Sequence, residues 1–198
     1  MTQNKIRVIG ITGITGSGTS TVASMLKEHG GLVISADSLA HGAIKKGLEA
    51  YKEIIEVFGD GVLKSDGEID RKALGVLVFG DENKKNRALL ESIIHPCVLN
   101  KIKELISNCE SSFVVIDAPL LIESGLYKEC DEVWLVIATD DVRVSRIMER
   151  DCIDKITAEK RLKSRQNEVN LINHTDVIIF NNGDIVALQE QVDKKVLH

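Results

Sequence analysis

Short apolar runs alternate with longer amphipathic stretches along the whole chain. Runs such as FVVID (113–117) and EVWLVIA (132–138) are too short and too rich in β-branched residues to be helices, so they are predicted strands. Similar runs predict strands at 6–12, 31–37 and 176–182. Continuous apolar strands separated by helices indicate a parallel sheet that is covered on both faces. We therefore predict an α/β fold, a three-layer sandwich around a five-stranded parallel sheet.

Helical periodicity fills the intervals between the predicted strands. The interval from about 41 to 108 contains no predicted strand, so we interpret it as a helical insertion on the substrate side. The core would then be residues 1–40 and 110–198, with a lid at about 143–170, which is rich in Arg and Lys. Without repeats or linkers, the 198 residues are predicted to form a single domain. The predicted helical stretches are 20–30, 38–58, 70–79, 82–108, 140–151, 157–168 and 184–197.

Composition narrows the class of protein. Hydrophobic residues make up 43% of the chain, and no apolar run approaches the roughly 18 to 20 residues that cross a bilayer, so we expect a cytoplasmic protein without a membrane partner. The 25 basic and 30 acidic residues give a net charge of −5, which argues against broad, non-specific nucleic-acid binding. The four cysteines form no C-x-x-C pair, so we expect free thiols and neither a zinc site nor a disulfide framework.

Polar residues follow each predicted strand. In an open parallel sheet, ligands bind beyond the carboxyl ends of the strands. The strand pattern alone therefore brings these residues to one edge of the sheet. They are Gly13–Thr21, Asp37, Asp117, Thr139–Asp141 and Asn181–Gly183.

The stretch GITGITGSGTST (10–21) resembles the phosphate-binding pattern G-x-x-x-x-G-K-[ST], with Thr19 in the place of the lysine. A glycine-rich turn between a strand and a helix points several backbone N–H groups at one place, where the helix dipole adds partial positive charge. Ser20 stands where a hydroxyl binds Mg²⁺. The alternative is an ordinary turn with a Ser/Thr helix cap. The predicted nucleotide-binding residues are Gly13, Gly16, Ser17, Gly18, Thr19, Ser20 and Thr21.

A dinucleotide site is a rival interpretation of the same glycines. GSGTST is close to G-x-G-x-x-G, and Asp37 lies about 20 residues further on, as expected for an NAD(P)-binding protein. The third glycine, however, is replaced by Thr21. This interpretation also leaves Asp117 and the arginine-rich segment without a role.

Two aspartates end predicted strands beside the loop. Asp117 ends FVVID, the place where P-loop proteins hold Mg²⁺ directly or through water; capping of the next turn is the alternative. Asp37, in SAD, can orient a substrate hydroxyl and accept its proton. Its alternative role is the N-cap of the following helix.

Three arginines recur in RVSRIMERD with helical spacing, at Arg143, Arg146 and Arg150. Arginine binds phosphate in a bidentate manner, and phosphoryl transfer needs cations on the developing charge. We favour this role for Arg146 and Arg150. The alternative is a solvated face that pairs with Glu149 and Asp151.

The predicted insertion holds three further candidates. Asp70 is a candidate cap for a helix, and Arg71 is either a contact to a substrate phosphate or a plain salt bridge. For His95, a structural or substrate-contact role is favoured over metal ligation.

Taken in order, these motifs resemble the dephospho-CoA kinase family over nearly the whole chain, from residue 8 to about 183. The most specific pieces are the DG-E-I-DR-K-AL pattern, the HP pair and D-A-P-L-L-I-E. The motifs that carry the resemblance are TGITGSGTSTVA, VISAD, FGDGVLKSDGEIDRKALG, HP, VVIDAPLLIESGLY, RIMERD and DVIIFNNG.

The resemblance implies a P-loop kinase fold with a helical CoA-side subdomain and a lid. It implies Mg²⁺-assisted transfer of the ATP γ-phosphoryl group to the ribose 3′-hydroxyl of dephospho-CoA, the last step of coenzyme A synthesis. Asp37 matches the catalytic aspartate of the family, and Arg146 and Arg150 match its lid arginines. Arg71 and His95 belong to pairs that match substrate-side motifs, and Asp117 is expected at both substrate and metal.

The sequence also departs from the family pattern. Thr19 replaces the loop lysine, Arg165 stands where a glutamine is more usual, and Leu171 stands near the place of an expected lysine. Three explanations for Thr19 stay open: another cation such as Arg146, Arg150 or Arg165 fills the gap, the chain binds nucleotide or CoA without efficient transfer, or the threonine is an introduced substitution.

Overall fold

The computed structural model describes residues 5–163 and 171–197. The chain forms two compact units. One comprises the described residues of 1–34 and 109–198, and the other comprises residues 35–108. Each unit has its own hydrophobic core and is described separately below. Among the described residues, no helix is long and apolar enough to span a bilayer, and the four cysteines are free thiols.

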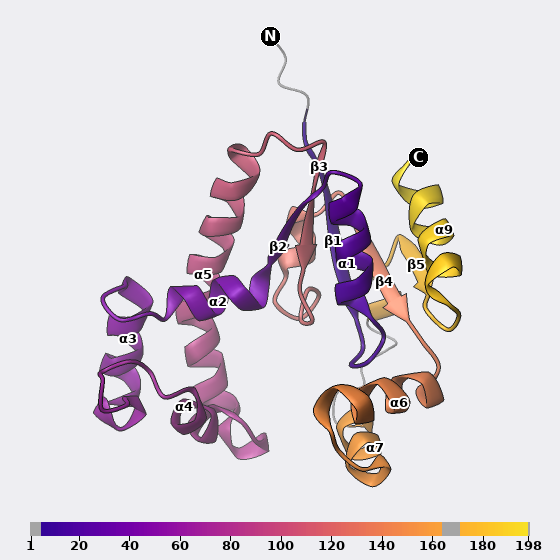
Figure 1. Ribbon diagram of the computed structural model, residues 1–198. Coiled ribbons are helices and arrows are strands. Elements are labelled where there is room, and N and C mark those ends of the chain that lie inside the picture. The colour runs from indigo at the N-terminus through magenta and orange to yellow at the C-terminus, as the bar shows by residue number, and fades with distance from the viewer. Residues whose placement is uncertain (1–4, 164–170, 198) are drawn as a thin grey trace. The chain divides into compact units, whose positions relative to one another are not determined.

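Five strands form one sheet with the order β2-β3-β1-β4-β5 (Figure 1). Strand β1 lies in the middle and pairs in parallel with β3 and β4, while β5 pairs in parallel with β4. The predicted five-stranded sheet is therefore confirmed. The strands are β1 (Arg7–Gly13), β2 (Leu32–Ser35), β3 (Phe113–Asp117), β4 (Glu132–Ile137) and β5 (Val177–Phe180).

The core of the first unit lies between the sheet and two helices, α1 (Thr19–Glu28) and α9 (Ile185–Val196). Alternate residues of the central strands, such as Ile9 and Trp134, are buried against these helices. The other helices for which the structure gives bounds in this unit are η3 (Leu126–Glu129), α6 (Asp140–Asp151) and α7 (Lys155–Lys163). A separate cluster of Val144, Ile147, Ala158 and Leu162 joins α6 to α7.

The second unit is built from helices, with one isolated β-bridge between Leu63 and Ile69. Its core gathers side chains such as Tyr51, Ile54 and Ile93. The elements are α2 (Ala36–Ala43), α3 (Glu49–Phe58), η1 (Asp60–Val62), α4 (Arg71–Val78), η2 (Asp81–Asn83) and α5 (Lys84–Ser107).

Two predicted boundaries were wrong. Strand β2 ends at Ser35 and does not extend to residue 37, because the Ser35 hydroxyl accepts a hydrogen bond from the Ser38 amide at 3.2 Å and begins α2. The predicted helical stretch 38–58 is divided into α2 and α3. Gly47 lies in the intervening turn with φ 91°, a left-handed conformation that helices do not contain.

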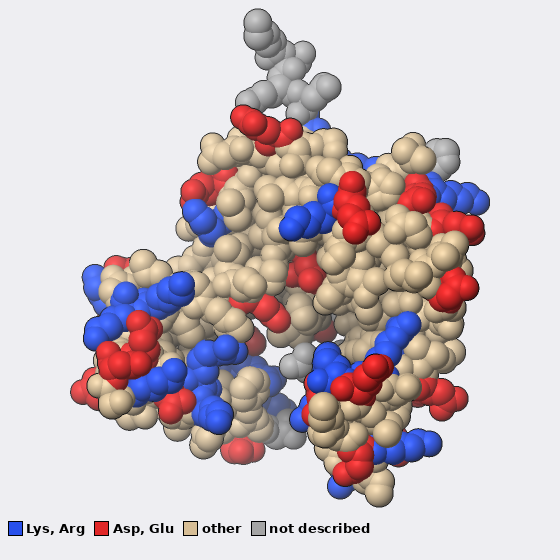
Figure 2. All heavy atoms as spheres, in the orientation of Figure 1, with Lys and Arg blue, Asp and Glu red and all other residues tan. Residues whose placement is uncertain are grey.

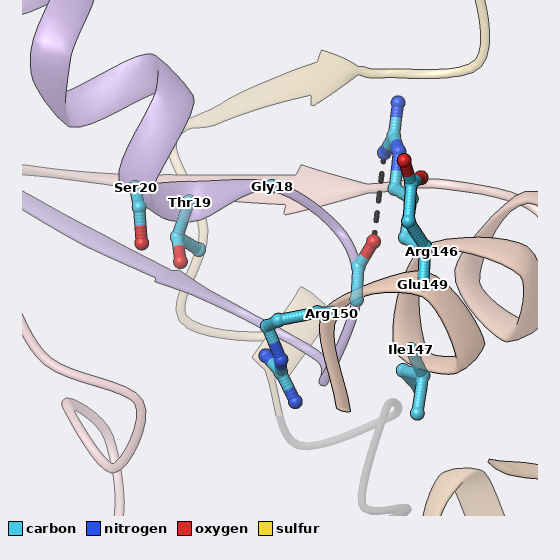
Figure 3. A pocket seen from close by; sticks show the side chains of 8 residues that line it. Gly18, Thr19, Ser20, Arg146, Ile147, Glu149 and Arg150 are labelled. Carbon is cyan, nitrogen blue, oxygen red and sulfur yellow. Dashed lines mark hydrogen bonds between the residues drawn. The ribbon is translucent and has the colours of Figure 1, made fainter. Parts of the chain in front are cut away.

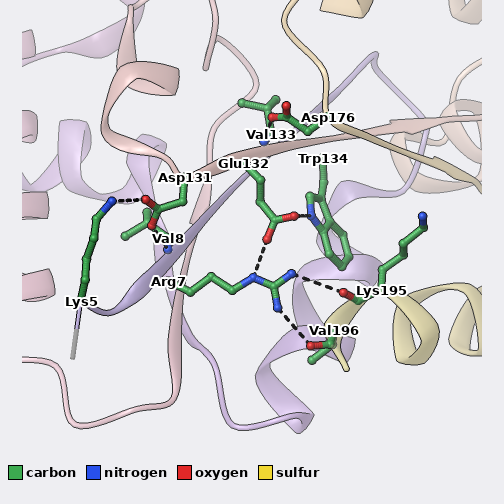
Figure 4. Close-up of polar contacts among 10 residues, drawn as sticks. All are labelled: Lys5, Arg7, Val8, Asp131, Glu132, Val133, Trp134, Asp176, Lys195 and Val196. Carbon is green, nitrogen blue, oxygen red and sulfur yellow. Dashed lines mark hydrogen bonds and ion pairs between the residues drawn. The ribbon is translucent and has the colours of Figure 1, made fainter. Parts of the chain in front are cut away.

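Polar side chains fasten the edge of the sheet that lies opposite the carboxyl ends of the strands (Figure 4). Asp131 accepts hydrogen bonds from Lys5 and, at 2.9 Å, from the Val8 amide. The Arg7 guanidinium donates to Glu132 and to the Val196 carbonyl at 3.0 Å. These contacts tie β1, β4 and the end of α9 together.

Acidic and basic side chains are interspersed over the visible face of the molecule, and neither sign dominates (Figure 2).

Asp131, at the amino end of β4, has a shifted pKa. Its partial burial acts to raise the pKa, but hydrogen bonds from Lys5 and the Val8 amide outweigh this, so the pKa lies below its ordinary value of 3.8.

We predict that Asp131→Asn destabilises the fold in a pH-dependent manner. Since the folded-state pKa is depressed, the carboxylate contributes stability above the unfolded-state pKa, and this contribution is lost as the pH falls through the folded-state pKa. Urea unfolding at pH 7 should therefore separate the variant from the wild type, and the gap should close towards pH 3. Asp60→Asn, which changes an exposed aspartate, is the matched control. A gap of equal size at both pH values would contradict the prediction.

Candidate active site

The loop between β1 and α1 is shaped by two glycines with left-handed backbone. Gly16 has φ 84° and Gly18 has φ 94°, a region that side chains with a Cβ rarely adopt. A hydrogen bond of 2.9 Å from the Ser17 amide to the Ile14 carbonyl closes the turn. Gly18 is the N-cap of α1 and has no side-chain cap. The Thr21 and Val22 amides donate to the Gly18 carbonyl, so the amides of Thr19 and Ser20 are the ones available to an anion.

The outward-facing carbonyls of the loop are met by donors from distant parts of the chain. The Arg143 Nε donates to the Thr15 carbonyl at 3.0 Å, and Arg146 Nη1 lies 3.5 Å from the Gly16 carbonyl and 3.3 Å from the Ser17 carbonyl. The Asn181 side chain donates to the Ser17 carbonyl at 2.8 Å. Helix α6 and the end of β5 therefore hold the loop from outside.

Arg143 is a buried brace for the loop. Its side chain is 1% exposed, and Nη1 donates to Asp140 at 2.9 Å, one turn earlier on α6. The interpretation of the arginine run as a solvated face is therefore wrong for Arg143. Sequence spacing alone could not show this, because burial is decided by the loop that packs against the helix.

A cleft of about 320 Å³ opens where the loop faces α6. Figure 3 shows Thr19 and Ser20 on one side and the side chains of Arg146 and Arg150 on the other, with the Arg146–Gly16 hydrogen bond dashed. The structure thus brings the loop and both predicted arginines together in one cleft. Its lining residues are Gly16, Gly18, Thr19, Ser20, Arg146, Ile147, Glu149 and Arg150.

Arg150 lines the cleft but is also paired. Its guanidinium donates two hydrogen bonds to Asp151, at 2.8 and 3.1 Å, and the first cause of its raised pKa is this contact. Arg161 of α7 binds the same carboxylate. The hydrogen bonds from Arg150 and Arg161 lower the pKa of Asp151, which therefore stays ionised at neutral pH.

Asp117 ends β3 beside the strand that leads into the loop. The parallel register places Asp117 opposite Ile11, two residues before Gly13. The following amide, of Ala118, donates to the Ile11 carbonyl at 3.1 Å, which fixes this position. Asp117 as a whole residue is half-buried.

The other candidates lie in the second unit. Asp37 is exposed in the first turn of α2, where Ser35 is the N-cap, so the alternative role of Asp37 as the cap is wrong. Arg71 begins α4 and His95 lies within α5, and both side chains are exposed. Asp70 caps α4, as predicted, by accepting from the Lys72 amide at 2.8 Å. Its hydrogen bonds from the backbone lower the pKa of this carboxyl.

The predicted lid of about 143–170 and Leu171, which follows it, are described in part by the structure. Helices α6 and α7 account for its described part, whereas Arg165 lies outside the described residues. Leu171 is 6% exposed and therefore belongs to the interior, where a lysine would need a partner for its charge.

Asn181 was placed at the sheet edge by its sequence position, but no role was predicted for it. It follows β5 directly, its side chain is buried, and it contacts the loop and Arg146. The available signal was weak: a polar residue at the carboxyl end of a parallel strand.

The sheet order, with a glycine-rich loop leading from the central strand into a helix whose first amides are available, defines a P-loop protein of the kinase type. A sequence profile described as dephospho-CoA kinase matches residues 7–187. The chain belongs to the dephospho-CoA kinase family, and the predicted resemblance is confirmed.

Related proteins are similar in sequence to this chain along nearly their full length. A dephospho-CoA kinase of Fusobacterium nucleatum is 41% identical, with 96% of each chain covered. One of Geobacillus kaustophilus is 39% identical, with 88% of each chain covered.

Solved structures of other proteins are similar to this chain in fold. A Thermus thermophilus protein matches with a TM-score of 0.83 at 31% identity, covering 98% of this chain and 97% of the other. Dephospho-CoA kinase from Campylobacter jejuni matches with a TM-score of 0.69 at 28% identity, covering 96% and 95%. A shikimate kinase of Acinetobacter baumannii, 14% identical with a TM-score of 0.55, covers 96% and 91% and shares the fold alone.

We predict that Arg143→Met lowers the free energy of unfolding by about 1–3 kcal/mol, because the Thr15 carbonyl and the Asp140 carboxylate lose a buried donor. Arg150→Met is the matched control on the same helix. Its exposed pair with Asp151 should change stability by no more than about 0.5 kcal/mol. Denaturant unfolding measures both variants. Equal losses would contradict the role of Arg143 as a brace.

Proposed function

We propose that this chain transfers the γ-phosphoryl group of ATP to the ribose 3′-hydroxyl of dephospho-CoA. The observation that carries the proposal is the braced loop of residues 13–21, which faces Arg146 and Arg150 across a cleft in a member of the dephospho-CoA kinase family. Free thiols and the absence of a bilayer-spanning helix among the described residues are compatible with a cytoplasmic enzyme.

The loop would bind the phosphates of ATP. The available amides at the start of α1 and the helix dipole attract the β- and γ-phosphates without any side-chain charge. Arg146, whose guanidinium is hydrogen-bonded to the loop, and Arg150 both line the cleft, where they would bind phosphate oxygens. Nucleotide affinity would thus rest mainly on backbone groups and arginines.

The residues present also fit Mg²⁺. A hydroxyl at Ser20 and a carboxylate at Asp117 are hard oxygen ligands, and Mg²⁺ with a nucleotide is usually held by one or two protein groups together with phosphates and water. The described residues contain no cluster of three or more His, Cys, Asp or Glu side chains suited to a metal. When bound, Mg²⁺ would neutralise charge on the phosphates.

The second unit would bind the acceptor substrate. We assign Asp37 as the general base that accepts the proton of the 3′-hydroxyl, because it is exposed and carboxylates perform this task in kinases. Arg71 and His95 are proposed contacts to dephospho-CoA. Arg146 is proposed to stabilise the negative charge on the transferred phosphoryl group.

Thr19 is the reason for a second candidate function. A threonine offers a hydroxyl but no charge where P-loop kinases place lysine. The loss of one such donor costs on the order of 10² to 10³ in rate, roughly 3 to 4 kcal/mol. A family member that binds nucleotide or CoA without efficient transfer is therefore the alternative.

We predict that Thr19→Lys raises kcat by about tenfold to a thousandfold, because it restores a cation at the loop. A coupled assay of ADP release with dephospho-CoA measures this effect. Ser24→Lys adds the same charge to an exposed position of α1 and is the control, for which no gain is expected. If wild type and Thr19→Lys both bind ATP but neither transfers phosphate, the kinase proposal is wrong and the alternative replaces it.

We predict that Asp37→Asn lowers kcat by about 10²- to 10⁴-fold and leaves the Kd of ATP within about twofold, because a general base acts on the hydroxyl and not on the nucleotide. Asp60→Asn, an exposed aspartate of the same unit, should leave both constants unchanged. Comparable losses in kcat and in ATP affinity would instead assign Asp37 a structural role.

A further inference from the structure

Asn181 is fixed in place by the sheet. Its backbone amide donates to the Ile137 carbonyl at 2.8 Å, which extends the pairing of β5 with β4 by one residue. Its side chain is 5% exposed and reaches the loop that leads into α1. A buried amide needs partners for both of its ends, and each end of this one has found a partner.

The two ends of the amide join the loop to helix α6. The Nδ2 group donates to the Ser17 carbonyl at 2.8 Å, and Oδ1 accepts from Arg146 Nη2 at 3.1 Å. Only this orientation pairs donors with acceptors, because a guanidinium cannot accept and a carbonyl cannot donate. One side chain therefore sets the position of a loop carbonyl and of a guanidinium together.

Gly18 provides the space for this contact. A Cβ at Gly18 would lie 2.2 Å from Asn181 Nδ2, which is closer than two non-bonded atoms can approach. The amide thus occupies the place of the side chain that the loop lacks, next to Thr19. Its position is set by the packing of the loop as well as by its hydrogen bonds.

The charge of Arg146 distinguishes it from the other two arginines of α6. Arg143 is paired with Asp140, and Arg150 is paired with Asp151. Within the described part of the chain, the hydrogen-bond partners of Arg146 are all neutral: two loop carbonyls and the Asn181 amide. Among the residues that the structure describes, no ion pair neutralises the positive charge that these contacts hold in place.

We propose that Asn181 is a positioning residue that holds the Arg146 guanidinium against the loop as a partial replacement for the missing lysine charge. The inference rests on the proposed function, since the charge matters where phosphate is bound. A neutral amide suits this task better than a carboxylate, because an ion pair with Arg146 would cancel the charge that the phosphate requires. Asn181 acts through Arg146 and the loop and does not contact the reacting atoms itself.

The test compares Asn181→Ala and Asn181→Asp with the wild type. For Asn181→Ala we expect the Kd of ATP to rise about tenfold, because a buried carbonyl and a guanidinium each lose a partner. Asn181→Asp has nearly the same shape, but it cannot donate to the Ser17 carbonyl and it neutralises Arg146. Its Kd should therefore rise at least as much. A Kd at the wild-type value in either variant overturns the proposal.

A double-mutant cycle separates positioning from a general loss of structure. In an Arg146→Ala background, Asn181→Ala should raise the Kd of ATP by clearly less than tenfold, because only the contact with the Ser17 carbonyl is left to lose. Independent losses that multiply would overturn the proposal. Asn86→Ala removes an asparagine that donates to the Leu77 carbonyl at 3.0 Å in the second unit, and it should leave the Kd of ATP unchanged.

Hydrogen exchange of the protein without ligand tests the loop directly. Residues 13–21 should exchange faster in Asn181→Ala than in the wild type or in Asn86→Ala, and unchanged exchange overturns the proposal. Neither readout requires dephospho-CoA. If the wild type and Thr19→Lys both bind ATP but transfer no phosphate, the proposed function is refuted and the test of Asn181 stays intact. If ATP does not bind, the exchange result decides alone.

Discussion

A loop can turn its backbone amides towards a phosphate only if its carbonyls, which then face outward, find donors elsewhere. In this protein the carbonyls of Thr15, Gly16 and Ser17 are met by Arg143, Arg146 and Asn181. Residues as far as 164 positions apart are joined by these contacts. The shape of the binding loop thus depends on the correct packing of α6 and β5, and the site forms only when the sheet is complete.

The three arginines of α6 divide this work by their position on the helix. Arg143 and Arg146 both contact carbonyls of the loop, and Arg150 lines the cleft together with Arg146. Burial of Arg143 is tolerated because the Asp140 carboxylate and the Thr15 carbonyl accept hydrogen bonds from its guanidinium. The same type of side chain therefore has three roles: Arg143 is a buried structural brace, Arg146 is a cation with neutral hydrogen-bond partners, and Arg150 forms a surface ion pair.

Much of this architecture was predictable from sequence because it depends on local patterns. Apolar runs marked the five strands, and the pattern of glycines marked the loop. The end of β2 was misplaced because the Ser35 hydroxyl, and not the hydrophobic pattern, ends the strand. The roles of Arg143 and Asn181 depend on partners more than 100 residues away, at separations of 128 and 164, so no local pattern contains them.

The substitution of lysine by Thr19 separates two properties that P-loop kinases usually combine. Ground-state binding of the phosphates draws on backbone amides and the helix dipole, which a side-chain change at residue 19 leaves in place. Stabilisation of the transferred charge needs a cation whose position does not have to be reorganised during the reaction. Arg146 satisfies this condition only because neutral partners hold it, since a carboxylate in place of Asn181 would fix the guanidinium equally well and remove its charge.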